Sequence, residues 1–379
     1  LDDRQMRHAV VLSAPVVAIH SGARDEIGAR GAGIESEAIM KIDTQMRDFD
    51  LLLVPDEARK MERIGFDAIW TFEAAHNPFL PLMQAVAATT RIEVGTNITV
   101  AFARSPFAVA QVAWDLQKAS RGRFHLGLGT QVRAHVERRF SMPFEHPARR
   151  IADYIRCLRA VWDTFQNDTR PDYQGEFYQF RLINPFFMPG RLDEPEIPIY
   201  LAGVNPRMCR VAGEVADGFH VHPMHSVSYV QEVIRPAIDD GAKAAGREAD
   251  GLGLFASVFA VTGETAAERA ESEAAVREQV AFYASTPNYR VLLEHHGFDA
   301  LGKELSDLMR RGEFEAMFKR VPDALMAEVA LVAEPDDLGA ALRRRYEGVL
   351  ERVSLYFPMP EGTPEAKWRD FVANFHAAA

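Results

Sequence analysis

The segment RFHLGLGTQVRAH, residues 123–135, indicates the fold class more directly than any other stretch of the chain. Its apolar run Phe124–Gly127 continues into a second glycine and Thr130, and then into a loop that contains arginine and histidine. A short apolar run of this kind is typical of a buried strand in a parallel sheet. Because ligands bind at the carboxyl ends of such strands, the loop is expected to open into a site for an anionic ligand.

Seven other short runs have the length and apolar composition of buried strands. They are Lys41–Asp43, Ala68–Thr71, Ile92–Val100, Ile199–Ala202, Gly218–His222, Leu252–Val261 and Val353–Tyr356. Segments with helical spacing of apolar residues separate them, and several begin with proline, which favours the first position of a helix. The predicted helices are Pro55–Gly65, Leu80–Thr89, Pro106–Ser120, Pro147–Phe165 and Arg207–Ala216, with a mostly helical stretch over Ala266–Arg345.

Strands that alternate with helices predict a parallel sheet, and eight such units over about 320 residues fit a (β/α)8 TIM barrel. We expect residues 40–379 to form this single domain. The stretch Ala266–Arg345 is longer than one crossover helix needs. A doubly wound open sheet is the alternative, although no Gly-x-Gly-x-x-Gly pattern follows the first strand.

Residues 1–39 allow two interpretations. Basic residues followed by the apolar run Ala9–Ile19 resemble a short signal peptide. Pro15 interrupts that run, however, and the glycine-rich Gly28–Gly33 is typical of a linker. Since the sequence from Met40 onward resembles the start of a native chain, we expect residues 1–39 to be a disordered or non-native extension.

Composition narrows the class of protein. A net charge of -11 argues against a general nucleic-acid binder, because phosphate backbones repel such a surface. The two cysteines, Cys157 and Cys209, are too few for a disulfide framework. No spacing typical of a metal site occurs, and no apolar run approaches the roughly 18 residues of a membrane span. We therefore expect a cytoplasmic protein with a small-molecule substrate and neither a metal nor a nucleic-acid or membrane partner.

One region is basic in spite of the overall charge. Between Arg133 and Arg159 there are seven arginines against three acidic residues. The planar guanidinium group suits phosphate and carboxylate, so this segment is a candidate contact for an anionic ligand. A solvated helix face explains the same pattern equally well.

In a TIM barrel the active site lies at the carboxyl ends of the strands. The candidates are therefore the residues that follow each strand, namely Glu73, His76, Asn97–Thr99, Thr130–His135, Ala202–Asn205, His222 and His225. The small residues Ala202–Val204 let backbone N–H groups approach a phosphate, and the helix dipole from Arg207 onward favours the same charge. Taken singly, each candidate is also explained as an ordinary loop residue.

Five segments, in this order, resemble the bacterial luciferase-like superfamily and most closely its branch that uses coenzyme F420, a deazaflavin. They are WTFEAAH at 70–76, GTNI at 95–98 with RSP at 104–106, GLGT at 127–130, LAGVNP at 201–206 and AGEVADG at 212–218. The resemblance extends from Met40 to about Pro360. It implies an eight-stranded barrel with a helical insertion before the last strand, and a homodimer.

The resemblance also implies where the cofactor binds. A non-proline cis peptide at Asn97–Ile98 would back the flavin-like ring, and the backbone of residues 203–208 would meet the tail phosphate. The glutamate tail could then run over the arginine-rich segment. The implied cofactor contacts are Glu73, Asn97, Ile98, Thr99, Thr130, His135, Ala202, Gly203, Val204, Asn205, Arg207 and Met208.

The chain departs from the sugar-phosphate dehydrogenases of that branch at the catalytic positions. Their Asp-His pair after the second strand is replaced by Glu73 and alanine, with the histidine at His76. Val132 occupies the place of their catalytic glutamate, and His222 and His225 replace a phosphate-binding threonine and lysine. We therefore do not expect a sugar-phosphate substrate, and we expect Val132, His222 and His225 to contact a different one.

These patterns favour a coenzyme F420-dependent oxidoreductase that transfers a hydride between the deazaflavin and a small organic substrate. His76 is the candidate general acid or base, oriented by Glu73, because histidine titrates near neutral pH. An FMN-dependent luciferase-like monooxygenase is the first alternative, and a non-enzymatic flavin- or deazaflavin-binding protein is the second. Aromatic residues in two insertion loops, including Phe186 and Tyr289, indicate either an apolar substrate or loop packing.

Overall fold

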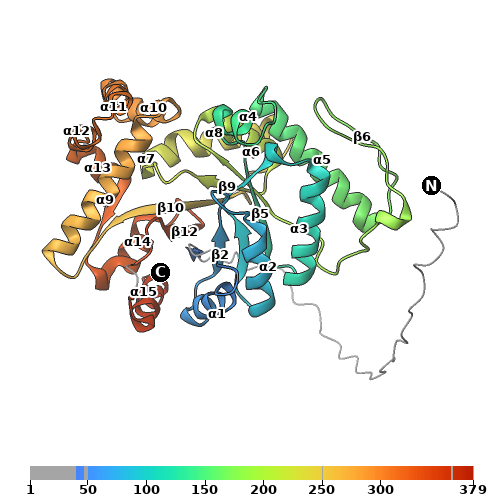
Figure 1. Ribbon diagram of the computed structural model, residues 1–379, viewed down its shortest axis with the longest axis horizontal. Helices are drawn as coiled ribbons and strands as arrows, with labels where there is room; N and C mark the ends of the chain where they lie inside the picture. Colours follow the sequence, from blue (N-terminus) through green and yellow to red (C-terminus); the bar gives the residue numbers. More distant parts are fainter. Residues whose placement is uncertain (1–39, 47–49, 250, 360–361, 379) are drawn as a thin grey trace, which may run out of the picture. The chain divides into compact units, whose positions relative to one another are not determined.

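Eight parallel strands close into a barrel at the centre of the described part of the chain (Figure 1). The computed structural model describes residues 40–46, 50–249, 251–359 and 362–378. The barrel strands are β1 Lys41–Gln45, β2 Ala68–Thr71, β3 Glu93–Thr96 with β4 Thr99–Val100, β5 Phe124–Gly129, β8 Ile199–Gly203, β9 Gly218–Val221, β10 Gly253–Val261 and β12 Arg352–Leu355. Each pairs in parallel with the next, and β12 pairs with β1 to close the ring. The predicted TIM barrel is confirmed.

Helices surround this barrel and follow the strands in alternation. Those between successive strands are α1 Val54–Ile64, α2 Phe79–Ala88, α3 Pro106–Ser120, α4 Arg133–Arg138, α5 Pro147–Asn167, α6 Pro206–Val215, α7 Val227–Tyr229 and α8 Arg235–Ala244. The stretch between β10 and β12 holds α9 Ala266–Ala284, α10 Arg290–His295, α11 Asp299–Arg311, α12 Phe314–Lys319, α13 Asp323–Val329, a short strand β11 Ala330–Val332, and α14 Leu338–Tyr346. This is the predicted helical insertion.

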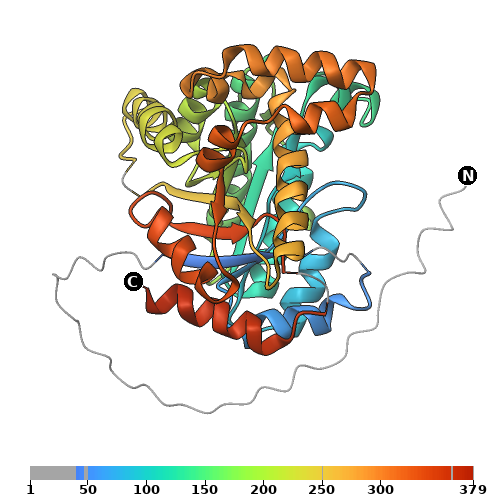
Figure 2. The same cartoon turned by 90° about the vertical axis from the view of Figure 1, so that its left-hand side faces the viewer.

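The two ends of the barrel carry different elements. In both ribbon views α10, α11 and α12 lie at the opposite end of the molecule from α1 and the last helix, α15 Glu365–Ala377 (Figures 1 and 2). A two-stranded hairpin, β6 Tyr173–Gln174 and β7 Gln179–Phe180, projects between α5 and β8. Among the described residues no helix is long and apolar enough to cross a membrane.

Helix boundaries follow from local chemistry. Pro106 occupies the first turn of α3, and the Ser105 hydroxyl accepts a hydrogen bond from Ala108 N at 3.2 Å. Both features favour a helix start, because the first N–H groups have no partner within the helix. Helix α1 ends at Gly65, whose φ of 107° is a left-handed conformation that glycine adopts without strain.

A buried ionic cluster fills the barrel at the starting ends of its strands. The Arg352 guanidinium contacts both carboxylate oxygens of Asp43, at 2.7 and 2.9 Å, and one oxygen of Glu93 at 2.6 Å. Trp70 donates its indole N–H to Asp43 at 2.8 Å, and Lys41 pairs with Glu93 at 2.5 Å. Every carboxylate of the cluster thus has partners, as buried charges require, and in a TIM barrel the active site is expected at the opposite ends of the strands.

The strand predicted over Ile92–Val100 is interrupted, because Asn97–Ile98 forms a cis peptide between β3 and β4. The cis bond expected from the family resemblance is thereby present. The interpretation of residues 1–39 lies outside the described residues and stays a prediction.

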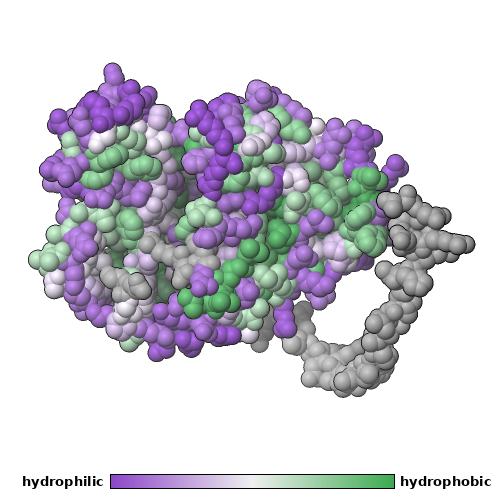
Figure 3. Space-filling view, viewed as in Figure 1, coloured by the Kyte–Doolittle hydropathy of each residue, from purple (hydrophilic) through white to green (hydrophobic). Residues whose placement is uncertain are grey.

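One exposed face is unusually apolar. Figure 3 shows apolar residues gathered in a band near α1 and α2. Leu52 and Leu80 are among the most exposed large apolar side chains of the described residues, at 86% and 56%, and Leu53 and Met83 are exposed beside them in sequence. The predicted homodimer stays a prediction.

Candidate active site

A cavity of about 810 Å³ opens at the carboxyl ends of the barrel strands. The loops after β3, β5, β8 and β9 supply most of its wall. The remainder comes from β1, the loop after β2, α6, β10, the insertion and the residues just after β12. Its lining residues are Gln45, Phe72, Asn97, Ile98, Gly129, Thr130, Gln131, Val132, Ala202, Gly203, Val204, Asn205, Met208, His220, Val221, His222, Pro223, Ser257, Tyr283, Asn288, Tyr289, Tyr356 and Phe357. None of these side chains is an acid, a lysine or an arginine, so the cavity wall carries no formal charge when its histidines are neutral.

The cis bulge on one side of the cavity is held from behind by Glu73. Its carboxylate accepts two hydrogen bonds from the Arg104 guanidinium, both at 2.8 Å, and one from Val100 N at 2.7 Å. Glu73 N also donates to the carbonyl of Ile98 at 3.1 Å. The Glu73 side chain is only 5% exposed, and both of its carboxylate oxygens already accept hydrogen bonds. It therefore fixes the position of Asn97–Ile98 at the cavity wall.

The opposite side is built from the end of β8 and the start of α6. Asn205 caps α6, with its Oδ1 accepting from Met208 N at 3.0 Å. A side chain at Gly203 would collide with Met208, whose Cγ lies 2.5 Å from the ideal Cβ position. Glycine therefore lets the β8 backbone run close to the first turn of α6, where N–H groups and the helix dipole favour an anion.

The insertion contributes an aromatic wall. Tyr289 Oη lies 2.8 Å from His222 Nε2, and the Tyr283 ring meets the His222 ring edge-on at 4.5 Å between centroids. The hydroxyl groups of Tyr283 and Tyr356 are hydrogen-bonded at 2.8 Å. Residues distant in sequence thus form two hydrogen-bonded pairs, which meet through the ring contact of His222 with Tyr283.

Burial sets the charge state of the two histidines that line the cavity. It lowers the pKa of His220 to about 3, and burial followed by the nearby His225 lowers the pKa of His222 to about 3. His220 lies over Trp70, with ring centroids 5.0 Å apart, and its Nδ1 has no hydrogen-bond partner among the described residues. Both rings are therefore neutral at physiological pH, and His220 offers an unused polar atom to a ligand.

The structure brings most of the predicted site residues together. Those that line the cavity are Asn97, Ile98, Thr130, Val132, Ala202, Gly203, Val204, Asn205, Met208 and His222. His225 is buried directly behind them, and its Nδ1 contacts the carbonyl of His222 at 2.9 Å. Thr99 is also buried, and its hydroxyl has no hydrogen-bond partner among the described residues.

Four other predicted residues do not line the cavity. Glu73 faces Arg104, and His76 is exposed in the loop after β2. His135 is exposed on α4, and Arg207 is exposed on the first turn of α6. The catalytic roles predicted for Glu73 and His76 remain untested predictions, but the contacts of Glu73 favour a structural role.

Sequence reasoning missed several lining residues for identifiable reasons. Gln45 and Ser257 come from within the inward faces of β1 and β10, and Gln45 Nε2 donates to Ser257 Oγ at 2.5 Å. Tyr283 and Tyr356 lie about 70 residues apart, and only the fold joins them. His220 on β9 lies two residues before His222, which follows the strand, and this period of two was the one signal that could have found it.

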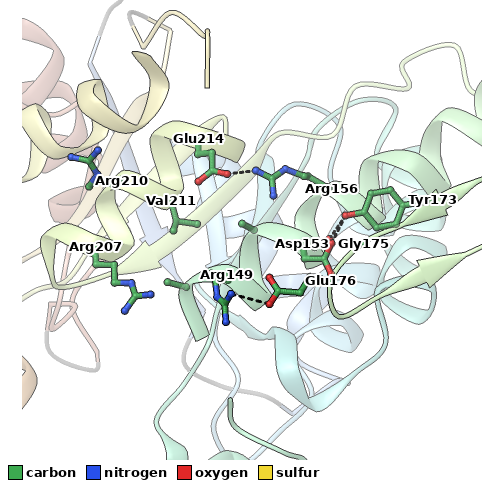
Figure 4. Close-up of a pocket in the computed structure, with 12 residues that line it drawn as sticks. Arg149, Asp153, Arg156, Tyr173, Gly175, Glu176, Arg207, Arg210, Val211 and Glu214 are labelled. Carbon is green, nitrogen blue, oxygen red and sulfur yellow. Dashed lines mark hydrogen bonds and ion pairs between the residues drawn. The ribbon is translucent and has the colours of Figure 1, made fainter. Parts of the chain in front are cut away.

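The basic segment forms part of a second hollow, of about 570 Å³, between α5, α6 and the β6–β7 hairpin. Figure 4 shows Arg149 paired with Glu176, Arg156 paired with Glu214, and Arg207 and Arg210 along the α6 side. Most of these arginines are thus neutralised by carboxylates, as expected for a solvated helix face. Arg207 has no ion-pair partner among the described residues, and it adjoins the Asn205 cap at the edge of the main cavity.

The barrel, the cis bulge and the cavity at the strand ends together define the candidate active site. The luciferase-like monooxygenase family model matches residues 40–352, so the chain belongs to that family. An uncharacterized protein of Mycobacterium tuberculosis is 45% identical over 314 residues, which are 83% of this chain and 92% of that one.

Two further comparisons concern reductases. The 5,10-methylenetetrahydromethanopterin reductase of Methanolobus tindarius is 27% identical over 298 residues, covering 77% of this chain and 86% of the reductase. The solved structure of the coenzyme F420-dependent tetrahydromethanopterin reductase from Methanopyrus kandleri superposes with a TM-score of 0.70. It is 21% identical and covers 88% of this chain and 97% of that one, so it shows the shared fold alone.

Proposed function

We propose that the protein is a coenzyme F420-dependent oxidoreductase that transfers a hydride between the deazaflavin and a small organic substrate. The observation that carries the proposal is the cavity itself, with the cis bulge Asn97–Ile98 on one side and the α6 start on the other. Such a cavity offers a wall for a planar ring and a backbone site for a phosphate. The likeness to a putative coenzyme F420-dependent oxidoreductase of Mycobacterium tuberculosis, 26% identical over 292 residues, supports the choice of cofactor.

The residues present fit the cofactor on two independent points. Thr99 Oγ1 and His220 Nδ1 are buried polar atoms without partners among the described residues, and a ligand with polar ring edges would satisfy such atoms. The Asn205 cap leaves the first turn of α6 facing the cavity, and Arg207 beside it can attract an anionic tail. When bound, the deazaflavin supplies the hydride.

The chain itself positions the two reactants and excludes charge. Asn97–Ile98 would hold the ring from behind, and the insertion would close over the substrate side. An uncharged wall in a low-dielectric cavity disfavours ionised substrates, because a charge buried there would have no partner. The main catalytic contribution of this site is therefore orientation and desolvation.

The proposal is tested by titrating the purified protein separately with F420 and with FMN while following cofactor fluorescence. We expect F420 to bind and FMN to bind at least tenfold more weakly. A tail-less deazaflavin riboside should bind more weakly than F420, and Arg207→Gln should narrow that difference. Tight binding of FMN alone would instead favour the FMN-dependent monooxygenase that the family description suggests.

A further inference from the structure

The hydroxyl hydrogen of Tyr289 has a direction that its neighbours determine. Met224 N donates a hydrogen bond to His222 Nδ1 at 3.0 Å, so Nδ1 is an acceptor and carries no proton. A neutral imidazole that accepts at Nδ1 carries its proton at Nε2. His222 Nε2 therefore donates to Tyr289 Oη across 2.8 Å. The phenol oxygen is the acceptor in this contact, and its own hydrogen remains available to another group.

Surrounding contacts keep this arrangement fixed. Burial, with a smaller effect of His225, lowers the pKa of His222, and burial raises the pKa of Tyr289, so both groups are neutral at physiological pH. His225 Nδ1 contacts the carbonyl of His222 at 2.9 Å and that of Pro223 at 3.1 Å, which holds the loop that carries His222. The pair therefore presents one O–H donor and does not change charge.

No acceptor for the hydroxyl hydrogen of Tyr289 lies within hydrogen-bond distance among the described residues. Tyr289 lines the cavity, and His222 is the one hydrogen-bond partner of its hydroxyl group among the described residues. The neighbouring hydroxyl groups of Tyr283 and Tyr356 are bonded to each other. A directed donor in an uncharged, aromatic cavity selects a ligand that brings one neutral acceptor and an apolar body.

We propose that Tyr289, oriented by His222, binds the substrate by donating a hydrogen bond to the oxygen of an uncharged carbonyl compound, a ketone or an aldehyde. The reaction of the bound carbonyl rests on the proposed function, but the binding of the carbonyl compound to Tyr289 needs no cofactor. A carboxylate of the same shape is disfavoured at the Tyr289 end of the cavity, because the lining there offers it no cation. Tyr289 is thus a specificity-determining residue contributed by the insertion.

The test uses three probes of similar shape on the protein without cofactor. They are acetophenone, which has a neutral carbonyl, benzoate, which is charged, and ethylbenzene, which has no acceptor. Ligand-observed NMR titrations compare wild type, Tyr289→Phe, and the control Tyr178→Phe, whose hydroxyl contacts Arg150 outside the cavity. Acetophenone should bind to wild type, and Tyr289→Phe should weaken it about three- to tenfold, the effect of one neutral hydrogen bond.

The other arms make the result specific. Ethylbenzene should bind wild type and Tyr289→Phe equally, Tyr178→Phe should bind acetophenone like wild type, and benzoate should bind at least tenfold more weakly than acetophenone. Equal acetophenone affinity in wild type and Tyr289→Phe, tighter binding of benzoate, or no binding of acetophenone to wild type would each overturn the proposal. These outcomes do not depend on F420, so a failure of the cofactor titration is a separate result.

A second measurement reads the orienting role of His222 directly. Long-range ¹H–¹⁵N NMR of ¹⁵N-histidine-labelled protein should show His222 as the neutral tautomer with its proton on Nε2 from pH 8 to about 5. Tyr289→Phe should shift that Nε2 signal, because the hydrogen-bond acceptor is removed, while Tyr178→Phe should not. A proton on Nδ1, or a cationic His222 at pH 6, would contradict the geometry.

Discussion

Replacing Glu73 by glutamine separates a structural role from a catalytic one. The carboxylate receives two bonds from Arg104 and one from Val100 N, and the side chain is 5% exposed. In Glu73→Gln one oxygen becomes an NH2 group that faces a donor, so at least one charge-assisted hydrogen bond is lost and the others weaken. A buried hydrogen bond to a charged group contributes about 1.5–3 kcal/mol, so we expect unfolding to be easier by about 2–3 kcal/mol.

Urea unfolding measured by circular dichroism tests this expectation. The control is Glu137→Gln, which breaks an Arg133–Glu137 pair of 2.7 Å whose side chains are 62% and 40% exposed. That change should cost less than about 1 kcal/mol, because water screens exposed pairs. Glu73→Gln should also weaken F420 binding through the displaced bulge. If Glu73→Gln unfolds like wild type but loses all turnover, Glu73 is a catalyst and the structural account is refuted.

Three further predictions concern the barrel and its mouth. Arg352→Met leaves Asp43 buried without its cation and should cost about 3–5 kcal/mol in urea unfolding, whereas Lys41→Met, at a 40% exposed position, should cost less than about 1 kcal/mol. Asn205→Ala removes the α6 cap, so it should lower the free energy of unfolding by about 1 kcal/mol and raise the Kd for F420. An unchanged Kd would show that the start of α6 does not bind the phosphate. Burial lowers the pKa of His220 and of His222 to about 3 and that of His225 to about 4. The melting temperature should therefore fall as pH drops from about 6.5 to 5, because these histidines bind protons in the unfolded chain but not in the folded one, and each changes the free energy of unfolding by about 1.4 kcal/mol per pH unit. A melting temperature that does not change over this pH range would contradict the lowered pKa values.

The sequence predicted the barrel well because local patterns determine it. Apolar runs such as Ala68–Thr71 became strands with the expected bounds, and Pro106–Ser120 became a helix with the expected bounds. The backbone features of the site were also predictable, since Asn97–Ile98 and the Gly203 segment belong to short, recognisable motifs. These features depend on residues that are neighbours in the chain.

Side-chain roles were harder to predict because their partners are distant in sequence. Glu73 was predicted to orient His76, and nothing in the sequence indicated that the fold would place Arg104 against it. Tyr289 belongs to the insertion and meets His222 only after the chain has passed β9, β10 and α9. No local pattern encodes such a contact, so a sequence can nominate these residues without pairing them.

The central claim is that the cavity at the strand ends holds a deazaflavin between the cis bulge and α6. A crystal structure of the protein with F420 tests it most directly. The account predicts the ring against Asn97–Ile98, the tail phosphate at the backbone of residues 203–208, and the open ring face toward Tyr289. A ring bound elsewhere, or a phosphate away from the start of α6, would contradict it.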